Sequence, residues 1–451
     1  MDTLHGWILA ADTFVWGPPL LVLLFGTHIF LTIRTGVMQR HLFTAIRLSV
    51  TAEQGAAGDV SPFAALTTAL AATIGTGNIV GVATAVSLGG PGAVLWMWLT
   101  GVLGMATKYS EALLAVKYRV RTADGTMLGG PMYALEKGLG LKWLAVLFAL
   151  FTVIASFGIG NMVQANSIST LAASTMGIGV QITGVVLMLL TAVVILGGLK
   201  SIARVCELLV PFMAIGYVAG CLAILAANSS LLWPAVQLIV SSAFSPTAAA
   251  GGFIGATVVT AARYGVARGL FSNESGLGSA PIVAAAAQSR NPVRQALVSA
   301  TGTFWDTVVV CLLSGLVIVT SILGQPEIGA LTGAELTAAA FREALPTFGP
   351  LLLTFGLLTF VFSTILGWSY YGERAAEYLW GKRMILPYRL LWVLAVYAGS
   401  VASLNFVWDF SDLANGLMAV PNLVALLLLS NVVAADTRRY LASGNLEMTG
   451  D

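Results

Sequence analysis

Long apolar runs, separated by short polar connections, make up most of this chain. Eleven of them reach the roughly 18 residues that a helix needs to cross the hydrocarbon core of a bilayer. They cover residues 15–34, 63–89, 92–116, 143–170, 178–198, 204–227, 250–287, 295–323, 349–379, 385–404 and 410–434. In lipid a backbone must satisfy its hydrogen bonds internally, and a helix does so within one segment. The sequence therefore predicts an all-α polytopic membrane protein with 11 transmembrane helices, in a single domain over residues 1–451.

The composition excludes several classes of function. Of the 451 residues, 57% are hydrophobic and only 9% are charged, whereas a soluble domain has about 25% charged residues. The net charge of +2 gives no reason to expect a nucleic-acid partner. The three cysteines lie in apolar runs and the three histidines show no metal-ligand spacing. We therefore expect a membrane protein that is no enzyme, has no disulfide or organic cofactor, and starts without a signal peptide.

Basic residues alternate between the two sides of the predicted bundle. Eighteen of the 22 Lys and Arg follow the first, third, fifth, seventh, ninth or last run. They are Arg34, Arg40, Arg47, Lys117, Arg119, Arg121, Lys137, Lys142, Lys200, Arg204, Arg290, Arg294, Arg374, Lys382, Arg383, Arg389, Arg438 and Arg439. The opposite loops hold only Arg342. Because basic loops stay in the cytoplasm, we expect an external N-terminus and a cytoplasmic C-terminus, in a bacterial inner membrane.

Glycines interrupt the second apolar run near its middle. Gly75 and Gly77 flank Thr76, and Asn78 follows. Glycine is about 1 kcal/mol worse than alanine in a helix. A break in lipid must have its freed backbone groups satisfied by protein, water or ligand, which is typical of transporter binding sites at mid-membrane depth. A helix crossing packed on glycines is the alternative, and the glycines alone do not separate the two.

A second interruption lies in the seventh run, where residues 269–278 combine three glycines with Ser272, Asn273 and Glu274. It comes five runs after the first. Because five is an odd number of crossings, a second copy of a five-helix unit enters the membrane from the opposite side, as in transporters with inverted repeats. We expect one repeat over residues 63–227 and the other over 250–434, with the helix at 15–34 as an addition outside the repeat.

Two motifs carry a resemblance to a known family. GTGNIVGVATAVSLGGPGAVLWMW and KYSEALLAVKYR lie between Thr73 and Arg119, and GLFSNESGLGSAPI runs from Gly269 to Ile282. They resemble the alanine or glycine:cation symporter family of the amino acid-polyamine-organocation superfamily, and the similarity extends over essentially the whole chain. The resemblance implies a leucine-transporter-like fold of five plus five inverted helices. It also implies uptake of small neutral amino acids coupled to sodium, or sometimes to protons.

The resemblance places a sodium site at the first break. Its ligands would be the carbonyls of Ala71, Ile74 and Phe360 and the hydroxyls of Ser363 and Thr364. The last three residues have the spacing i, i+3, i+4, which puts them on one helix face. Neutral oxygens suit a weakly held Na⁺ and differ from a carboxylate-rich calcium site. Without the resemblance, the two hydroxyls would be expected to bond their own helix backbone.

The free N–H groups of a broken helix suit a substrate carboxylate. Thr76, Gly77 and Asn78 supply them, although Asn78 could instead be a packing hydrogen-bonder. Trp368 lies one helical turn beyond Thr364, whose hydroxyl is one of the expected sodium ligands. The resemblance makes it a wall of the substrate pocket, and an interfacial anchor is the alternative.

Further candidate substrate residues lie in two other runs. Phe157, Asn161 and Gln164 belong to the fourth run, where polar side chains usually face a cavity or the protein interior. Ser272 and Asn273 belong to the second break, where they could contact the substrate amine or its backbone.

Five charged residues in or near the runs have less defined roles. Glu274 could contact a cation or amine, but a structural pair with Arg263, Arg268 or another cation is favoured. Lys108, Glu111 and Asp306 could form gates or structural ion pairs, as could Glu207.

These observations predict a secondary active symporter that imports alanine, glycine or a similar small neutral amino acid with Na⁺. The chain has no phosphate-binding glycine loop, so ATP is not expected to supply the energy. Proton coupling is the first alternative and a membrane channel is the second. An intramembrane enzyme is disfavoured, because no paired acids, metal ligands or activated nucleophile are evident.

Overall fold

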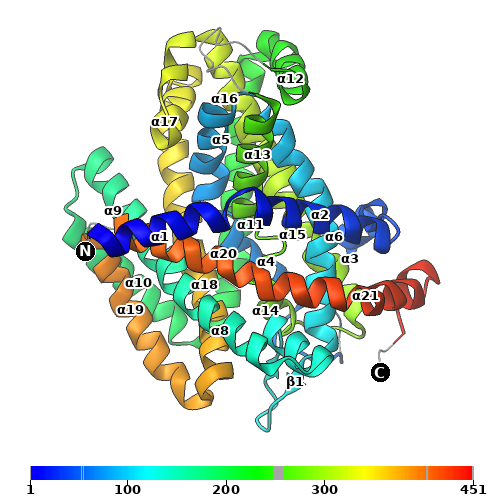
Figure 1. Cartoon of the computed structure of the whole chain (residues 1–451). Helices are drawn as coiled ribbons and strands as arrows, with labels where there is room; N and C mark the ends of the chain where they lie inside the picture. Colours follow the sequence, from blue (N-terminus) through cyan, green and yellow to red (C-terminus); the bar gives the residue numbers. More distant parts are fainter. Residues whose placement is uncertain (1, 52, 54, 247–256, 403–404, 449–451) are drawn as a thin grey trace.

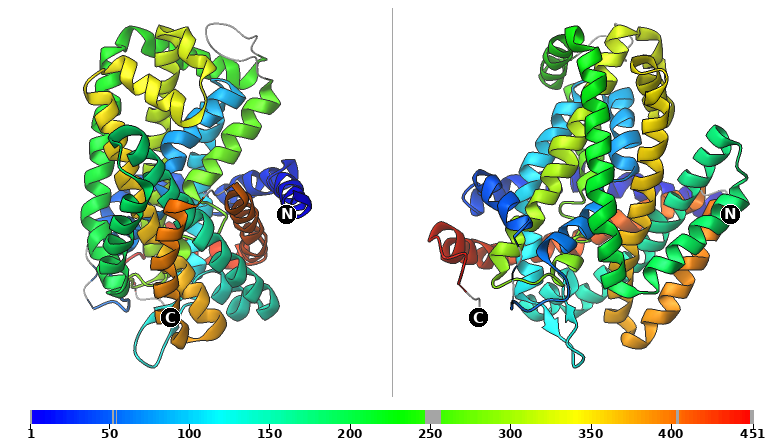
Figure 2. Two further views of the ribbon diagram at one scale, coloured as in Figure 1. Left: turned by 90° about the vertical axis from the view of Figure 1, so that its left-hand side faces the viewer. Right: turned by 180° about the vertical axis from the view of Figure 1, so that it is seen from behind.

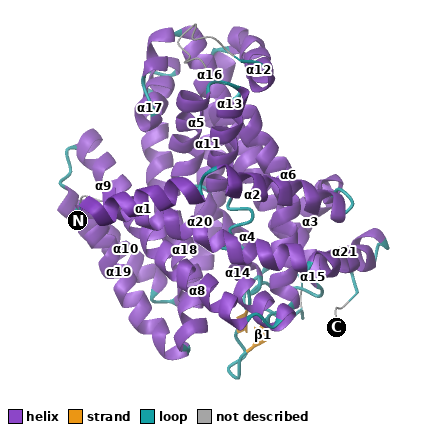
Figure 3. Cartoon of the chain, in the orientation of Figure 1, coloured by secondary structure: helices purple, strands orange, loops and turns teal. Residues whose placement is uncertain are grey.

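Helices form nearly all of the protein (Figure 1, Figure 3). The computed structural model describes residues 2–51, 53, 55–246, 257–402 and 405–448. Within these ranges the strands are confined to one short antiparallel hairpin, β1 (Val120–Arg121) and β2 (Met127–Leu128). The predicted all-α membrane class is confirmed.

The helices follow one another with short connections. In chain order they are α1 (Asp2–Val15), α2 (Pro18–Arg34), α3 (Leu42–Ser49), α4 (Pro62–Thr73), α5 (Val82–Gly89), α6 (Ala93–Lys117), α7 (Pro131–Tyr133), α8 (Lys142–Phe157), α9 (Val163–Met176), α10 (Val180–Ile195), α11 (Gly198–Ala227), α12 (Ser229–Phe244), α13 (Val258–Asn273), α14 (Pro281–Ala284), α15 (Pro292–Thr303), α16 (Leu312–Gly324), α17 (Gly333–Ala344), α18 (Phe348–Trp380), α19 (Ile385–Val401), α20 (Asn405–Leu428) and α21 (Ser430–Asp436).

By length and hydropathy, the described residues contain seven helices able to cross a membrane, or eight if one bent pair counts as a single span. This is fewer than the eleven expected. The run expected at 92–116 is helical as α6 but carries several polar residues, and that at 178–198 is only the 16-residue α10. The run at 250–287 is described from residue 257 on, and its residues 250–256 lie outside the described part, as do residues 403–404 at the end of another run.

Both expected helix breaks are present. α4 begins with the hydroxyl of Ser61 accepting from the N–H of Ala64 at 3.0 Å, and it ends where Ile74 leaves the helix with ψ 98°. The π-helical turn η2 (Gly77–Gly81) then leads into α5, and the two halves are bent by 54°. α13 ends at Glu274, whose φ is +56°, and helix resumes only at α14. The inverted-repeat relationship between the halves stays a prediction.

The two breaks lie inside the bundle and are packed by other helices. α4 contacts α11 and α18, while α13 contacts α5 and α6. Figure 1 shows α1 and α2 crossing the front of the bundle, with α20 and α21 running below them, and the right-hand view of Figure 2 shows the bundle from behind. In Figure 1, α5, α12 and α17 lie at the top and the hairpin at the bottom. The breaks are therefore held between two opposite ends of the molecule.

Candidate functional site

A small cavity of about 20 Å³ lies at the first break. Gly75, Thr76 and Gly77 line it from the break itself, and Glu274 lines it from the second break. Its other polar or aromatic walls are Gln164 of α9, Thr364 and Trp368 of α18, and Asn415 of α20. Such a volume is enough for about one water molecule. Residues from five distant parts of the sequence thus surround one space.

The five expected sodium ligands are brought together beside this cavity. The hydroxyl of Ser363 donates to the carbonyl of Ala71 at 3.2 Å, which ties α18 to the last turn of α4. All five residues are buried. A Cβ built on Gly75 would lie 2.9 Å from the hydroxyl oxygen of Thr364, so only glycine lets the break approach this hydroxyl so closely.

The donor set at this position fits a monovalent cation. The carbonyl of Ile74 is released from the helix because this residue has left helical geometry. The hydroxyls of Ser363 and Thr364 also donate to the carbonyl of Phe360 at 2.8 and 3.0 Å, so their oxygen lone pairs remain available as ligands. Among the described residues no group of three His, Cys, Asp or Glu side chains could hold a metal ion. The oxygens gathered here are neutral.

Trp368 closes one side of the cavity and is almost fully buried. Its indole N–H donates to Oε1 of Glu274 at 3.0 Å, and the other carboxylate oxygen of Glu274 accepts from the hydroxyl of Ser279. The favoured pairing of Glu274 with Arg263 or Arg268 is therefore not what forms. These two guanidinium groups instead lie over aromatic rings on their own helix. Glu274 has the αL conformation and its carboxylate bonds Trp368 of α18, a contact that residue spacing could not indicate.

Two buried amide oxygens have no hydrogen-bond partner among the described residues and belong to side chains that line the cavity. They are Oε1 of Gln164 and Oδ1 of Asn415. The amide nitrogen of Gln164 donates to the carbonyl of Ile159 at 2.9 Å. Since an unpaired buried acceptor is costly, both oxygens are ready to accept from a bound donor. Asn415 was missed at the sequence level, although a polar residue within the run 410–434 was a usable signal.

Asn161 and Phe157 lie away from the cavity. The amide nitrogen of Asn161 donates to the carbonyl of Trp392 at 2.9 Å. The ring of Phe157 packs against Tyr388 and Trp392, with centroids 5.1 and 5.3 Å away. Both side chains join α8 and its π-helical extension η4 (Gly158–Met162) to α19, and they do not contribute to the described cavity wall.

The side chain of Asn78 is engaged with the helix break and with Asp306. Its Oδ1 accepts from the N–H of Gly75 at 2.8 Å, and its Nδ2 donates to the Asp306 carboxylate at 2.7 Å. The other oxygen of Asp306 accepts from the hydroxyls of Ser272, at 2.9 Å, and Thr307, at 2.6 Å. One buried carboxylate therefore joins the two breaks. A lone acid inside the run 295–323 was the available signal.

A second buried carboxylate organises the irregular segment after α13. Oε1 of Glu111 accepts from the N–H groups of Gly276 and Gly278 at 3.0 and 3.1 Å and from Asn422 at 2.7 Å. Its Oε2 lies 3.9 Å from the ammonium of Lys108, and both side chains are buried. Backbone donors freed by the break are thus satisfied by this acid. Asn273 is engaged too, because its Nδ2 donates to the hydroxyl of Thr307 at 3.1 Å.

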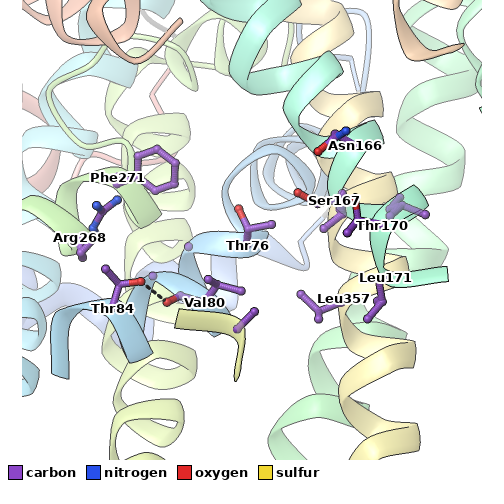
Figure 4. A pocket seen from close by; sticks show the side chains of 15 residues that line it. Thr76, Val80, Thr84, Asn166, Ser167, Thr170, Leu171, Arg268, Phe271 and Leu357 are labelled. Carbon is purple, nitrogen blue, oxygen red and sulfur yellow. Dashed lines mark hydrogen bonds between the residues drawn. The ribbon is translucent and has the colours of Figure 1, made fainter. Parts of the chain in front are cut away.

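A larger cavity of about 470 Å³ adjoins the small one (Figure 4). Both cavities share Thr76, Gly77 and Phe271 as walls. Figure 4 shows Phe271 and Arg268 on one side, Leu357 and Leu171 on the other, and Thr76 between them. We call this larger cavity the vestibule. It flanks the α5 half of the broken helix and ends at the first break.

The similarity to known proteins extends over almost the whole chain. Residues 1–449 match the model of the sodium:alanine symporter family. The chain is 55% identical to the sodium/alanine symporter AgcS of Methanococcus maripaludis, with 95% of each chain covered. It is 54% identical to an uncharacterized transporter of Haemophilus influenzae, covering 97% of this chain and 96% of that one.

A likeness to a solved structure concerns the fold alone. A crystal structure of MhsT in complex with L-phenylalanine superposes with a TM-score of 0.58 at 15% identity, covering 85% of this chain and 93% of that one. The leucine-transporter-like fold is therefore shared at the level of helix arrangement. With a family model over 449 residues and relatives above half identity, this chain belongs to the sodium:alanine symporter family, a family of sodium-coupled amino-acid transporters and not of enzymes.

Proposed function

We propose that this chain imports alanine, glycine or a similar small neutral amino acid together with Na⁺. The observation that carries the proposal is the first helix break, whose carbonyl end faces two hydroxyls of α18 while its N–H end faces a small buried cavity. Carbonyl and hydroxyl oxygens suit a hard cation, and free N–H groups suit a carboxylate. The sodium/alanine name of the relative at 55% identity supports the same pair of substrates.

An amino acid needs more room than the small cavity provides, so we place it where this cavity meets the vestibule, at Thr76 and Gly77, which line both. Its carboxylate would meet the N–H groups of Thr76 and Gly77 at the start of η2. Its ammonium would donate to the two unpaired amide oxygens of Gln164 and Asn415. The indole of Trp368 then limits the length of the side chain. We assign Asn78, Ser272 and Asn273 a supporting part, because their side chains already bond Asp306 or Thr307.

Sodium and substrate would be coupled because they use the same break. The carbonyls of Ala71 and Ile74 would bind the ion. The N–H groups that would bind the substrate carboxylate lie only a few residues further along the chain. Each ligand therefore favours the same arrangement of α4 and η2, so that each raises the affinity for the other. A channel would have no such reciprocity.

The energy available is sufficient for strong accumulation. One Na⁺ moving with a zwitterion carries one positive charge, for which a potential of 100 mV supplies about 2.3 kcal/mol. A tenfold Na⁺ gradient adds about 1.4 kcal/mol. Together they support an accumulation of about 500-fold.

We also propose eleven membrane crossings arranged as two inverted five-helix units, with α1 and α2 outside the repeat. The five-run spacing of the two breaks supports the repeat, and α6, α10 and α13 would supply the crossings that hydropathy alone does not identify. We infer from the basic loops that the hairpin end lies in the cytoplasm and the α5 end outside. The vestibule then opens toward the outside, in the direction from which substrate arrives.

The test is uptake of labelled alanine by purified protein in proteoliposomes. We expect uptake, with an inward current, under a Na⁺ gradient in the absence of a proton gradient. Counterflow of labelled against unlabelled alanine should also occur, which separates a carrier from a channel. Uptake that follows pH and ignores Na⁺ would instead favour the proton-coupled alternative, and uptake without charge movement would contradict coupling to one sodium.

A further inference from the structure

Two segments far apart in the sequence are joined at the hairpin end of the protein. Residues 57–60 lead into α4, and residues 285–289 follow α14. Val60 and Ala287 face each other across an isolated parallel β-bridge. We call these two segments the inner clasp.

Direct backbone contact closes the inner clasp. The N–H of Asp59 donates to the carbonyl of Ala286 at 2.7 Å, and the N–H of Gln288 donates to the carbonyl of Val60 at 2.8 Å. A Cβ built on Gly58 would overlap the backbone of Gln288. The segments meet this closely only because Gly58 has no side chain.

Arg119, in the connection between α6 and β1, binds both halves of the inner clasp at once. Its Nη1 donates to the carbonyls of Ala285 and Ala287 at 3.1 and 2.8 Å, and its Nη2 donates to the carbonyl of Ala57 at 3.0 Å. A guanidinium presents several donors in a fixed plane, which allows one side chain to hold three carbonyls. Because the donor is charged, these hydrogen bonds are stronger than those between two neutral groups.

The inner clasp and the vestibule lie at opposite ends of the two broken helices. The inner clasp adjoins the start of α4 and the end of α14, whereas the vestibule adjoins η2, α5 and α13. Figure 1 places the hairpin and α14 in the lower part of the molecule and α5 and α17 in the upper part. The inner clasp therefore lies on the opposite side of the first break from the vestibule.

We propose that Arg119 is a positioning residue that keeps the inner end of the transport path closed. It does so by binding the two segments of the inner clasp, before α4 and after α14, to each other. The proposal rests on the proposed import function, because a carrier must open its two ends alternately. Release of substrate into the cytoplasm requires the half-helices α4 and α14 to separate. The three bonds of Arg119 and the backbone contacts of the inner clasp must then break together.

The first experiment measures how often the inner clasp opens. Gln288→Cys places a thiol on the partly buried inner clasp, and the native cysteines Cys206, Cys221 and Cys311 are buried. We expect a small thiol reagent, applied from the cytoplasmic side of inside-out vesicles, to react about tenfold faster when Arg119→Gln is added. Arg119→Lys should lie between, since one ammonium cannot hold three carbonyls in the same geometry.

Two matched variants separate a role of Arg119 from general disturbance. Arg121→Gln removes an exposed guanidinium only two residues away, in β1, and should leave the labelling rate unchanged. Gly58→Ala should raise labelling as strongly as Arg119→Gln does, because its methyl group forces the inner clasp apart. Faster labelling in Gly58→Ala but not in Arg119→Gln would overturn the assignment to Arg119.

A reversible cross-link tests whether opening belongs to the transport cycle. Facing residues of neighbouring strands are about 5 Å apart, within the range that a disulfide spans. Val60→Cys with Ala287→Cys should transport when reduced and lose uptake at least tenfold when oxidised, while Na⁺-dependent alanine binding persists. Arg121→Cys with Met127→Cys, which face each other within the hairpin, should transport in both states.

Two results of the cross-link would overturn the proposal. One is normal uptake by the fully oxidised Val60–Ala287 pair, and the other is loss of binding together with uptake, since a gate on the inner side leaves the outer approach intact. The proposed function is judged separately. Absence of Na⁺-dependent alanine uptake in the unmodified protein would defeat it, while the labelling rates, which need no transport, would still report on the inner clasp.

Discussion

Ser363 of α18 donates a hydrogen bond to the carbonyl of Ala71, across 3.2 Å, at the last turn of α4 before the helix breaks. The bond joins two residues that are 292 positions apart and brings the hydroxyl of Thr364 against Gly75. A site for a cation therefore depends on how α18 is docked onto α4. Substitutions at this contact should change the Na⁺ dependence of uptake while the protein remains folded.

Thr364→Ala should raise the Na⁺ concentration for half-maximal uptake by about tenfold, which corresponds to about 1.4 kcal/mol. The substitution removes one proposed oxygen ligand and little volume. Thr359→Ala is the matched control, because this hydroxyl of the same helix bonds the carbonyl of Phe355 at 2.8 Å and is partly exposed. Initial uptake rates at graded Na⁺ measure the effect. An unchanged Na⁺ dependence in Thr364→Ala would remove this residue from the ion site.

Trp368→Ala should weaken alanine transport and admit amino acids with longer side chains, because the indole fills one wall of the small cavity. Trp368→Phe keeps an aromatic wall but removes the N–H that donates to Glu274. It should retain the size limit better than Trp368→Ala. Competition of unlabelled amino acids against labelled alanine measures both. Wild-type specificity and affinity in Trp368→Ala would show that the indole does not face the substrate.

Gly77→Val should abolish uptake while the protein remains folded. A Cβ at this position would lie 3.2 Å from the backbone of Ser272 and 3.4 Å from the ring of Phe271, and the larger side chain would also crowd the proposed carboxylate site. Gly81→Ala is the control, since its methyl group meets nothing closer than 3.9 Å. Uptake should be compared at equal amounts of monodisperse protein, and activity in Gly77→Val would contradict the assignment.

Asn415→Leu should raise the alanine concentration for half-maximal uptake by about 10- to 100-fold, because it removes one proposed acceptor for the ammonium group. The loss of a hydrogen bond to a charged group is worth about 1.5–3 kcal/mol. Its Na⁺ dependence at saturating alanine should change little, and this comparison is the internal control. A shift in the Na⁺ dependence alone would place Asn415 elsewhere in the mechanism.

Asp306→Asn should destabilise the protein by about 1–3 kcal/mol. Three side chains donate hydrogen bonds to the Asp306 carboxylate, and an asparagine would turn one of its two oxygens into a donating NH₂ group, so at least one of the three would lose its acceptor. Those donors come from Asn78, Ser272 and Thr307. Thr320→Ala is a milder change in the same span, where the hydroxyl bonds its own helix. Thermal unfolding in detergent and uptake rates should fall together for Asp306→Asn. Wild-type values in both would show that the link between the breaks is dispensable.

Several features could be predicted because they depend on local chemistry. Runs of apolar residues indicate membrane helices through length alone, and the glycines around Thr76 mark a break because glycine is a poor helix former. The motifs at residues 73–119 and 269–282 were sufficient to indicate the family. The candidate ion ligands followed from the same resemblance and from the spacing of hydroxyls on one helix face.

Side-chain partners could not be predicted in the same way. Glu274 bonds Trp368 and Ser279, although its nearest cations in sequence are Arg263 and Arg268. These partners come from α18 and from the irregular segment after α13, which are brought together only by the packing of the chain. Phe157, at the end of α8, and Asn161, in η4, likewise contact α19, which is more than 200 residues further along the chain.

The sequence by itself determined that this is a helical membrane protein with two broken helices, because hydropathy and glycine placement act over short distances along the chain. Only the tertiary structure decided which polar groups meet. Asp306 joins the two breaks, Glu111 satisfies the N–H groups of Gly276 and Gly278, and Arg119 fastens residues 57–60 to 285–289. A buried polar group must find a partner wherever the packed helices place one, and that choice depends on distances in space that residue spacing does not contain.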